Sequence, residues 1–494
     1  MLAWLIIGLY GLSLVVIFFY ALLQASLAIN YLKEKKRRRK VATREQEKIE
    51  NFPFVTIQLP VYNEKYVVER LLNQTLQLNW PKDKIEFQVL DDSNDETTEI
   101  LEKEISTYKN LGFQIHHVRR SNRDGYKAGA LKYGMTLAKG EFIAIFDADF
   151  LPDPEFLNKT IPSFNDKKVG VVQTRWEHIN REFSLLTKLQ AFALDAHFSV
   201  EQVGRNVGGH FINFNGTAGI WRKKTIEDAG GWETDTLTED LDLSYRAQLK
   251  NWKFIYREDI ASPAELPVAM SALKSQQFRW TKGGAETFKK MAGKLLFSPG
   301  LRFSDRIHGL THLFNSSVFV FVLLLALCSV PLVYFVSKSE ILSIWVDYSA
   351  VFFVSTIFLM FYYAVSFRET NSNLFKKIVF FIFRFIQFLA IMIGLSYYNT
   401  QAVLLGYFGK KTAFIRTPKF NLEQTKSGRW KKNSYLNSKL KFSSLIELIL
   451  AGYFVSGIIL GIKTEVYGMI PFHSLLSLGF LSVFTYSILE KKGD

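Results

Sequence analysis

Carboxylates follow two apolar segments of this sequence, at places where they could bind a metal ion or a nucleotide. Asp147 and Asp149 form a D-x-D pair directly after the run EFIAIF, and Asp91 and Asp92 follow IEFQVL in the same way. Two oxygen ligands at positions i and i+2 suit Mg²⁺ or Mn²⁺ that also binds a diphosphate. A D-x-D alone is a weak signal, because many turns contain one. The acids of 91–100 also fit the end of a strand followed by a capped helix.

Two later motifs favour a chemical role for these acids. TED (238–240) and QQFRW (276–280) follow the D-x-D in order along the chain. An inverting displacement at a sugar carbon needs a carboxylate that takes the proton from the acceptor hydroxyl. It also needs positive charge that stabilises the departing nucleotide diphosphate. Asp240 can supply the first, a metal with Arg279 the second, and Trp280 offers a flat apolar face for a sugar ring.

The segment between 54 and 177 predicts the scaffold that positions these groups. Strands are expected in FVTIQLPVYNE, IEFQVLDDS, FQIHHVRR and EFIAIFDAD, and helices over 65–78, 95–110 and 127–138. Short apolar strands that alternate with such helices are typical of right-handed βαβ units and a mostly parallel sheet. Ligands of these sheets bind beyond the carboxyl ends of the strands, so both acidic clusters should lie on that edge. We therefore expect an α/β domain over 51–300.

The rest of the chain has the composition of a membrane protein. Of the 494 residues 48% are hydrophobic, the net charge is +15, and residues 2–32 carry no charged side chain. This exceeds the roughly 20 apolar residues that span a bilayer, so 1–32 is predicted to be an uncleaved transmembrane anchor. The run KEKKRRRK opens a basic linker, 33–50, that the positive-inside rule places in the cytoplasm, and nucleic acid is not an expected partner. Further spans are predicted near 310–336, 346–367, 443–462 and 468–489.

Segment 378–408 is long enough to cross the membrane but is interrupted by Arg384, Gln387, Asn399 and Gln401. Both of its flanks look cytoplasmic, which requires zero or two crossings. We expect zero, with the segment lying in the interface as an amphipathic stretch. The prediction is then five spans, with the N-terminus outside, and a channel region over 301–494. The single cysteine permits no intrachain disulfide, which fits a reducing location for the soluble part.

Seven motifs in series carry a resemblance to a known family. LPVYNE, VLDDS, GYKAGAL, IFDAD, NFNGTAG, TED and QQFRW resemble a family 2 glycosyltransferase with a GT-A fold. Residues 52–290 are most similar to the plant cellulose synthase-like mannan synthases of subfamily A and to the glucan-forming subfamily C. The resemblance implies a GT-A domain fused to a helical transmembrane domain, with Mg²⁺ or Mn²⁺ as cofactor. It also implies GDP-mannose or UDP-glucose as donor, a growing polysaccharide as acceptor, and a cytosolic catalytic domain at the cell membrane.

The resemblance further implies roles for matching residues on the donor side. Metal binding falls to Asp147 and Asp149, and Asp240 would be the general base in a catalytic set with Asp149 and Arg279. The nucleotide and its phosphates would be bound by Pro60, Tyr62, Glu64, Asp92, Lys127, Asp147, Gln276 and Arg279.

On the acceptor side, the turn FNGT stands where cellulose synthases have a CGS-type turn, and Asn215 replaces the cysteine. Acceptor contacts are expected from Asn215, Gly216, Thr217, Glu239 and Trp280. FIRTPK, within a cytosolic loop at 409–441, resembles the gating loop of cellulose synthases, and Arg416 replaces its valine. Closure over the nucleotide would involve Phe414, Thr417 and Lys419.

We expect a processive, inverting synthase that extends a β-1,4-linked mannan or glucomannan and moves it across the membrane. A β-1,4-glucan synthase that uses UDP-glucose is the nearest alternative. A non-processive lipid glycosyltransferase is a second one, against which the extra helices, QxxRW and the gating-like loop argue. A transporter or receptor with a nucleotide-binding regulatory domain is a third, against which the complete set of catalytic acids argues. The sequence does not identify accessory subunits.

Overall fold

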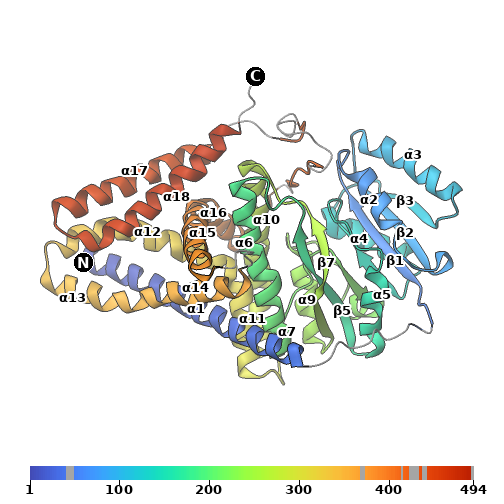
Figure 1. Ribbon diagram of the computed structural model, residues 1–494, viewed down its shortest axis with the longest axis horizontal. Helices are drawn as coiled ribbons and strands as arrows, with labels where there is room; N and C mark the ends of the chain where they lie inside the picture. Colours follow the sequence, from blue (N-terminus) through green and yellow to red (C-terminus); the bar gives the residue numbers. More distant parts are fainter. Residues whose placement is uncertain are drawn as a thin grey trace.

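Two regions of different composition lie side by side in the molecule, as the ribbon of the computed structural model shows (Figure 1). A sheet with helices around it occupies one side, and long apolar helices occupy the other. The structure describes residues 1–40, 49, 51–367, 373–412, 415–421, 433–436 and 442–490. The α/β domain and the helical membrane region expected from the sequence are both confirmed.

A seven-stranded mixed sheet forms the centre of the α/β domain, in the order β3-β2-β1-β4-β6-β5-β7. Strands β1, β2, β3 and β4 are parallel neighbours, β5 and β7 are parallel, and β6 runs antiparallel between β4 and β5. The strands are β1 Val55–Val61, β2 Ile85–Asp91, β3 Ile115–Arg119, β4 Phe142–Ile145, β5 Val169–His178, β6 Gly219–Arg222 and β7 Lys253–Ala264. All four predicted strands are present.

The helices of this domain follow the strands as predicted, with one shorter than expected. The predicted helix 65–78 is limited to Val68–Thr75, because the Glu64 carbonyl accepts bonds from Val67 and Val68 in a preceding turn. A π-helical turn, Ala196–Glu201, joins α6 to α7. The helices are α2 Val68–Thr75, α3 Thr97–Asn110, α4 Tyr126–Leu137, α5 Phe156–Thr160, α6 Leu185–Asp195, α7 Gln202–Gly208, α8 Lys223–Asp228, α9 Glu239–Leu249 and α10 Met270–Phe297.

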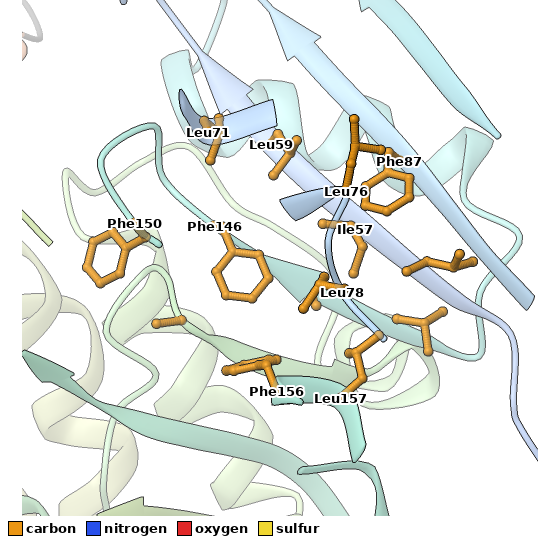
Figure 2. Close-up of a cluster of buried hydrophobic side chains, with 14 of the residues drawn as sticks. Ile57, Leu59, Leu71, Leu76, Leu78, Phe87, Phe146, Phe150, Phe156 and Leu157 are labelled. Atoms are coloured by element: carbon orange, nitrogen blue, oxygen red, sulfur yellow. The ribbon is translucent and has the colours of Figure 1, made fainter. Parts of the chain in front are cut away.

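One face of the sheet packs on a fully apolar core, shown in Figure 2. Ile57 and Leu59 of β1 point to this face and meet Leu71 of α2. The core extends under the D-x-D motif, since Phe146 and Phe150, on either side of the two aspartates, are both buried in it. Truncating a buried side chain of this size costs about 3–5 kcal/mol, so the two rings hold the motif firmly. The aspartates between them are left at the sheet edge.

The other face of β1 and β2 is polar, and its groups pair with each other. The hydroxyl of Thr56 donates to the carboxylate of Glu86 at 2.7 Å, and Gln58 lies 3.0 Å from Gln88. Helix α4 covers this face closely, because a Cβ at Gly134 would lie only 2.6 Å from the Gln58 side chain. This packing fixes α4, whose first turn carries Lys127.

The second region consists of long apolar helices. They are α1 Leu2–Lys40, α11 Phe303–Phe314, α12 Val318–Val336, α13 Glu340–Ser349, α14 Val354–Ser366, α15 Leu374–Gly394, α16 Ser396–Tyr407, α17 Phe442–Lys463 and α18 Ile470–Leu489. Six segments of the described residues are long and apolar enough to cross a membrane: 2–40, 303–336, 340–366, 374–394, 444–463 and 467–489. Each of the five predicted spans therefore coincides with a suitable helix, and the chain is a multi-pass membrane protein.

The one apolar segment among these six that was not predicted to span is 374–394, which is α15. It lies within the stretch 378–408 and its flank, where an interfacial helix was predicted. In Figure 1 α15 is foreshortened and does not follow the direction of α1, α12, α17 and α18. Its placement in the interface stays a prediction. Helix α1 continues through Lys40, so the expected linker 33–50 begins as a helix, and Arg38 there pairs with Glu258 of β7 at 3.0 Å.

Candidate active site

The carboxyl ends of β1, β2 and β4 meet at one edge of the sheet, where their loops line a common cavity. This donor pocket contains ten of the residues that the sequence places around a nucleotide and its metal or in the gating loop, Arg279 among them. It is lined by Pro60, Tyr62, Glu64, Asp92, Lys127, Asp147, Asp149, Thr417 and Lys419, together with Arg279, Arg123 and Arg416. The parallel register of the three strands brings these loops together, as expected for such a sheet.

Asp91 and Asp92 have different surroundings, although they are neighbours in sequence. The Asp91 carboxylate accepts a bond from the Ser93 N–H at 2.8 Å and contacts His117 at 2.9 Å, so it ends the strand and stabilises the turn. Asp92 faces the donor pocket and is held by two guanidinium nitrogens of Arg120 at 2.9 and 2.5 Å. Only the second acid is placed to contact a ligand.

An aromatic ring with a cation on its face lies beside Asp92. The Arg123 guanidinium carbon is 3.2 Å from the centroid of the Tyr62 ring, and both side chains line the pocket. Planar groups of this kind provide surfaces on which a nucleobase can stack.

Each aspartate of the D-x-D motif is bonded to a lysine. Lys127 Nζ lies 2.5 Å from Asp147 and 2.9 Å from the Gly216 carbonyl oxygen, and Lys419 Nζ lies 2.6 Å from Asp149. Burial lowers the pKa of Lys127, but the attraction of Asp147, Glu239 and Asp240 outweighs it and leaves the pKa above its usual value. Lys127 is therefore a cation at neutral pH.

The surroundings of the D-x-D motif fit a divalent cation. Asp147 and Asp149 offer hard oxygen ligands, which suit Mg²⁺ or Mn²⁺, and each is paired with a single lysine that a cation would have to displace. Among the described residues, a group of three carboxylates that could hold a metal lies elsewhere, at Glu233, Asp235 and Asp242. Lys290 pairs with all three at 2.5–3.0 Å and Arg246 pairs with Asp242 at 2.8 Å, so two basic side chains already occupy that group.

A second cavity, which we call the acceptor cavity, adjoins the donor pocket. The two share five charged side chains: Lys127, Asp147, Asp149, Arg279 and Lys419. Burial lowers the pKa of Arg279 to about 10, which keeps it charged at neutral pH. Its guanidinium donates to the Thr417 hydroxyl at 2.8 Å and to the Ile415 carbonyl, so it also holds the loop that carries Lys419.

Asp240 lines the acceptor cavity from the first turn of α9. Burial, followed by repulsion from Glu239, raises the pKa of its carboxyl to about 7. Its Oδ1 accepts a bond from the Leu241 N–H at 2.8 Å, which orients the group. Gly216 makes room for the other oxygen: its φ is +78°, and a Cβ there would lie 2.9 Å from Asp240 Oδ2. Asp240 therefore presents to this cavity a carboxyl that can exchange a proton near neutral pH.

The other residues predicted for the acceptor divide into two groups. Cavity-lining residues are Asn215, Gly216, Glu239 and Trp280. Gln276, which was predicted to bind the nucleotide, lines this cavity and not the donor pocket. The side chain of Thr217 is fully buried, and its hydroxyl accepts a bond from the Asp147 N–H at 2.8 Å. Thr217 therefore positions the D-x-D motif.

The gating-like loop lies against the donor pocket through three of its residues. Arg416 pairs with Glu64 at 2.5 Å and lies 4.1 Å from the centroid of the Tyr435 ring. Burial raises the pKa of Glu64 to about 7 in spite of the attraction of Arg416. Thr417 and Lys419 also line the pocket, whereas Phe414 lies outside the described residues.

Comparison with known proteins agrees with this geometry. The sequence profile described as Glycosyl transferase family 2 matches residues 56–227, and that of Glycosyl transferase family group 2 matches 142–368. Glucomannan 4-beta-mannosyltransferase 2 of Arabidopsis thaliana is 33% identical over 444 residues, 88% of this chain and 80% of its own. The chain belongs to glycosyltransferase family 2.

Two further similarities complete the comparison for this family 2 glycosyltransferase. Probable glucomannan 4-beta-mannosyltransferase 4 of Oryza sativa subsp. japonica is 45% identical over 262 residues, 52% of this chain and 48% of its own. In these matches the aligned part of the chain spans about half the length of each relative. A mannosyltransferase of Pyrobaculum calidifontis, solved with GDP-Man and Mn²⁺, has the same fold, with a TM-score of 0.52 and 18% identity over 80% of this chain and 100% of its own.

Several residues that line or support the two cavities were not predicted from the sequence. Arg120 and Arg123 orient Asp92 and Tyr62, and the dense run RRSNR after the predicted strand was the available signal. Trp176 and His178 line the acceptor cavity from the end of β5. They lie at alternate positions, which places them on the same side of a strand, and that spacing could have indicated them.

Proposed function

We propose that this family 2 glycosyltransferase transfers mannose from GDP-mannose to the end of a growing β-1,4-linked polysaccharide, with inversion at the sugar carbon. The observation that carries the proposal is the meeting of the donor pocket and the acceptor cavity at five charged side chains. A diphosphate at this point would have its nucleoside toward Asp92 and its sugar toward Asp240. The names of the relatives favour mannose as the sugar.

Asp240 performs the proton transfer in this proposal. The acceptor hydroxyl oxygen bonds to the anomeric carbon while the bond from that carbon to the diphosphate oxygen breaks. Asp240 takes the hydroxyl proton, and the nucleotide diphosphate leaves with the electron pair. Lys127 and Arg279 stabilise the charge of the leaving diphosphate. Trp280 provides a stacking face for the acceptor sugar.

Asp147 and Asp149 would hold a divalent cation, which supplies further positive charge to the diphosphate when bound. Because Lys419 contacts Asp149 at 2.6 Å, this carboxylate would have to release the lysine for the cation. The released ammonium would then be free to bind the diphosphate. Closure of the loop over the nucleotide follows from this exchange.

A path for the product is proposed along α16. Asn399 is fully buried, and neither atom of its amide has a hydrogen-bond partner among the described residues. Its neighbour Tyr398 packs on Phe278 of α10, with ring centroids 5.5 Å apart, and Phe278 is two residues from Trp280 in the sequence. An unpaired amide within an apolar region is costly unless it meets water or a polar ligand. We propose that the polysaccharide passes this amide as it leaves the acceptor cavity.

One observation favours a second candidate, the transfer of a sugar to a lipid. An almost wholly apolar cavity adjoins Trp280, and its walls come from α6, α10 and α15. An acyl or polyprenyl chain would fit such a lining. The same experiment separates the two functions.

The test uses the full chain in lipid nanodiscs with Mn²⁺ or Mg²⁺, given labelled GDP-mannose or UDP-glucose. We expect label from GDP-mannose in a polymer that an endo-β-1,4-mannanase degrades, and we expect no polymer from Asp240→Asn. Label from UDP-glucose in a product cut only by a β-1,4-glucanase would overturn the choice of mannose. Label in solvent-extracted lipid without polymer would overturn the polysaccharide acceptor.

A further inference from the structure

A polar pocket lies between the start of α6 and the middle of α15, outside the donor pocket and the acceptor cavity. Three basic side chains line it, with two acidic ones, and we call it the α6–α15 pocket. Its charged and hydroxyl residues are Arg181, Lys188, Arg384, Glu182, Asp195 and Ser366.

The acids of the α6–α15 pocket are already bonded to two of the bases. Arg181 donates to both oxygens of Asp195, at 2.7 and 2.9 Å, and Lys188 pairs with Glu182 at 2.9 Å. Arg384 differs, because its Nη1 is buried and has no hydrogen-bond partner in the part of the chain that the structure describes. A buried guanidinium donor without an acceptor is unfavourable. Among the described residues, Arg384 Nη1 therefore has no hydrogen-bond acceptor, and a ligand with acceptor oxygens could supply one.

The neighbours of Arg384 indicate how deep this side chain would lie in a membrane. Arg181, Glu182 and Lys188 belong to the α/β domain, and charged side chains such as these do not lie in the hydrocarbon of a bilayer. Other side chains of α15 are apolar and between 48% and 73% exposed: Phe375, Ile378, Val379, Phe380, Phe383 and Ile386. This division fits the predicted placement of α15 in the interface, with its apolar side toward the acyl chains.

We propose that the α6–α15 pocket binds the phosphate of an anionic phospholipid. Phosphate oxygens would accept bonds from Arg384, and the neighbouring Arg181 and Lys188 would add positive charge. The exposed apolar side chains of α15 and the ring of Phe367 would contact the acyl chains. Basic pockets on the cytoplasmic side of membrane helices are suited to such head groups. A free phosphate would satisfy Arg384 but would leave the apolar side of α15 uncovered.

The test measures lipid binding by the purified full chain, in nanodiscs of phosphatidylcholine that contain a small share of phosphatidylglycerol. Lipids retained after gentle extraction are counted by native mass spectrometry for wild type, Arg384→Gln and Lys376→Gln. Lys376 is an exposed base on the same helix that does not line the pocket, so it controls for general charge attraction. We expect wild type and Lys376→Gln to retain phosphatidylglycerol. Arg384→Gln should bind it about tenfold more weakly, because the substitution removes one charge-assisted hydrogen bond.

Three outcomes would overturn the proposal. These are equal retention by Arg384→Gln, equal loss in both variants, and displacement of the lipid by millimolar inorganic phosphate. The last would identify the ligand as free phosphate. Lys188→Gln is an independent variant, whose base is 35% exposed. It should also reduce retention, and it carries the test if Arg384→Gln fails to fold.

Discussion

The pH dependence of the transfer step provides a direct test of Asp240 as the base. Burial and the neighbouring Glu239 raise its pKa to about 7, and only the ionised form can accept a proton. The ionised fraction of such a group is about 90% at pH 8 and about 10% at pH 6. We therefore expect kcat to fall roughly tenfold between these pH values.

Changing Glu239 to glutamine tests the cause of the raised pKa. Glu239→Gln removes the negative charge beside Asp240, so the midpoint of the acidic limb should move to lower pH, whatever happens to the maximal rate. Asp235→Asn is the matched control, because Asp235 pairs with Lys290 and does not line the acceptor cavity. It should leave the midpoint unchanged.

The assay is the initial rate of label incorporation at saturating donor between pH 5.5 and 9. Saturation matters because Glu64, in the donor pocket, also has its pKa raised to about 7 and would affect donor affinity. A kcat that is constant between pH 6 and 8 would exclude Asp240 as the base. An unchanged midpoint in Glu239→Gln would exclude Glu239 as a cause of the raised pKa.

Three further predictions concern the metal, the turn beside the base, and the topology. Asp149→Ala should abolish turnover and EDTA should silence the wild type; full activity in EDTA, measured by label incorporation, would exclude the proposed cation. Gly216→Ala should reduce kcat by at least ~10²-fold, because its Cβ would press on Asp240; Gly231→Ala, with a similar φ of +75° and open space around it, should remain active. Cysteines introduced at 372 and 425 in a cysteine-free background should both resist an impermeant thiol reagent in intact cells, and labelling at 425 alone would show that α15 crosses the membrane.

The order of strands and helices could be predicted because it depends on local pattern. Apolar runs that end in acidic residues marked β2 and β4, and the structure places Asp92 and the D-x-D motif at one edge, as expected. The membrane helices were predictable for the same reason, since an apolar stretch of sufficient length needs no partner to be recognised.

Long-range pairs could not be predicted from local pattern. Lys419 is 270 positions from Asp149, and Arg416 is more than 300 from Glu64, so no spacing rule links them. Strand β6 inserts between β4 and β5, two strands that precede it in the chain, and pairs antiparallel with both. Thr217 was expected at the acceptor, and its burial against the D-x-D motif depends on that same insertion.

The lysine on each aspartate of the D-x-D motif makes donor entry resemble ion exchange. In the free protein, Lys419 neutralises Asp149, and Lys127 neutralises Asp147. A nucleotide diphosphate sugar that arrives with a divalent cation is close to neutral as a pair. With that pair bound, the cation would replace the Lys419 ammonium on the acid, and the ammonium would move to the phosphate. When the nucleotide leaves, the lysine can return, so the buried acid is opposed by a positive charge before, during and after each sugar is added.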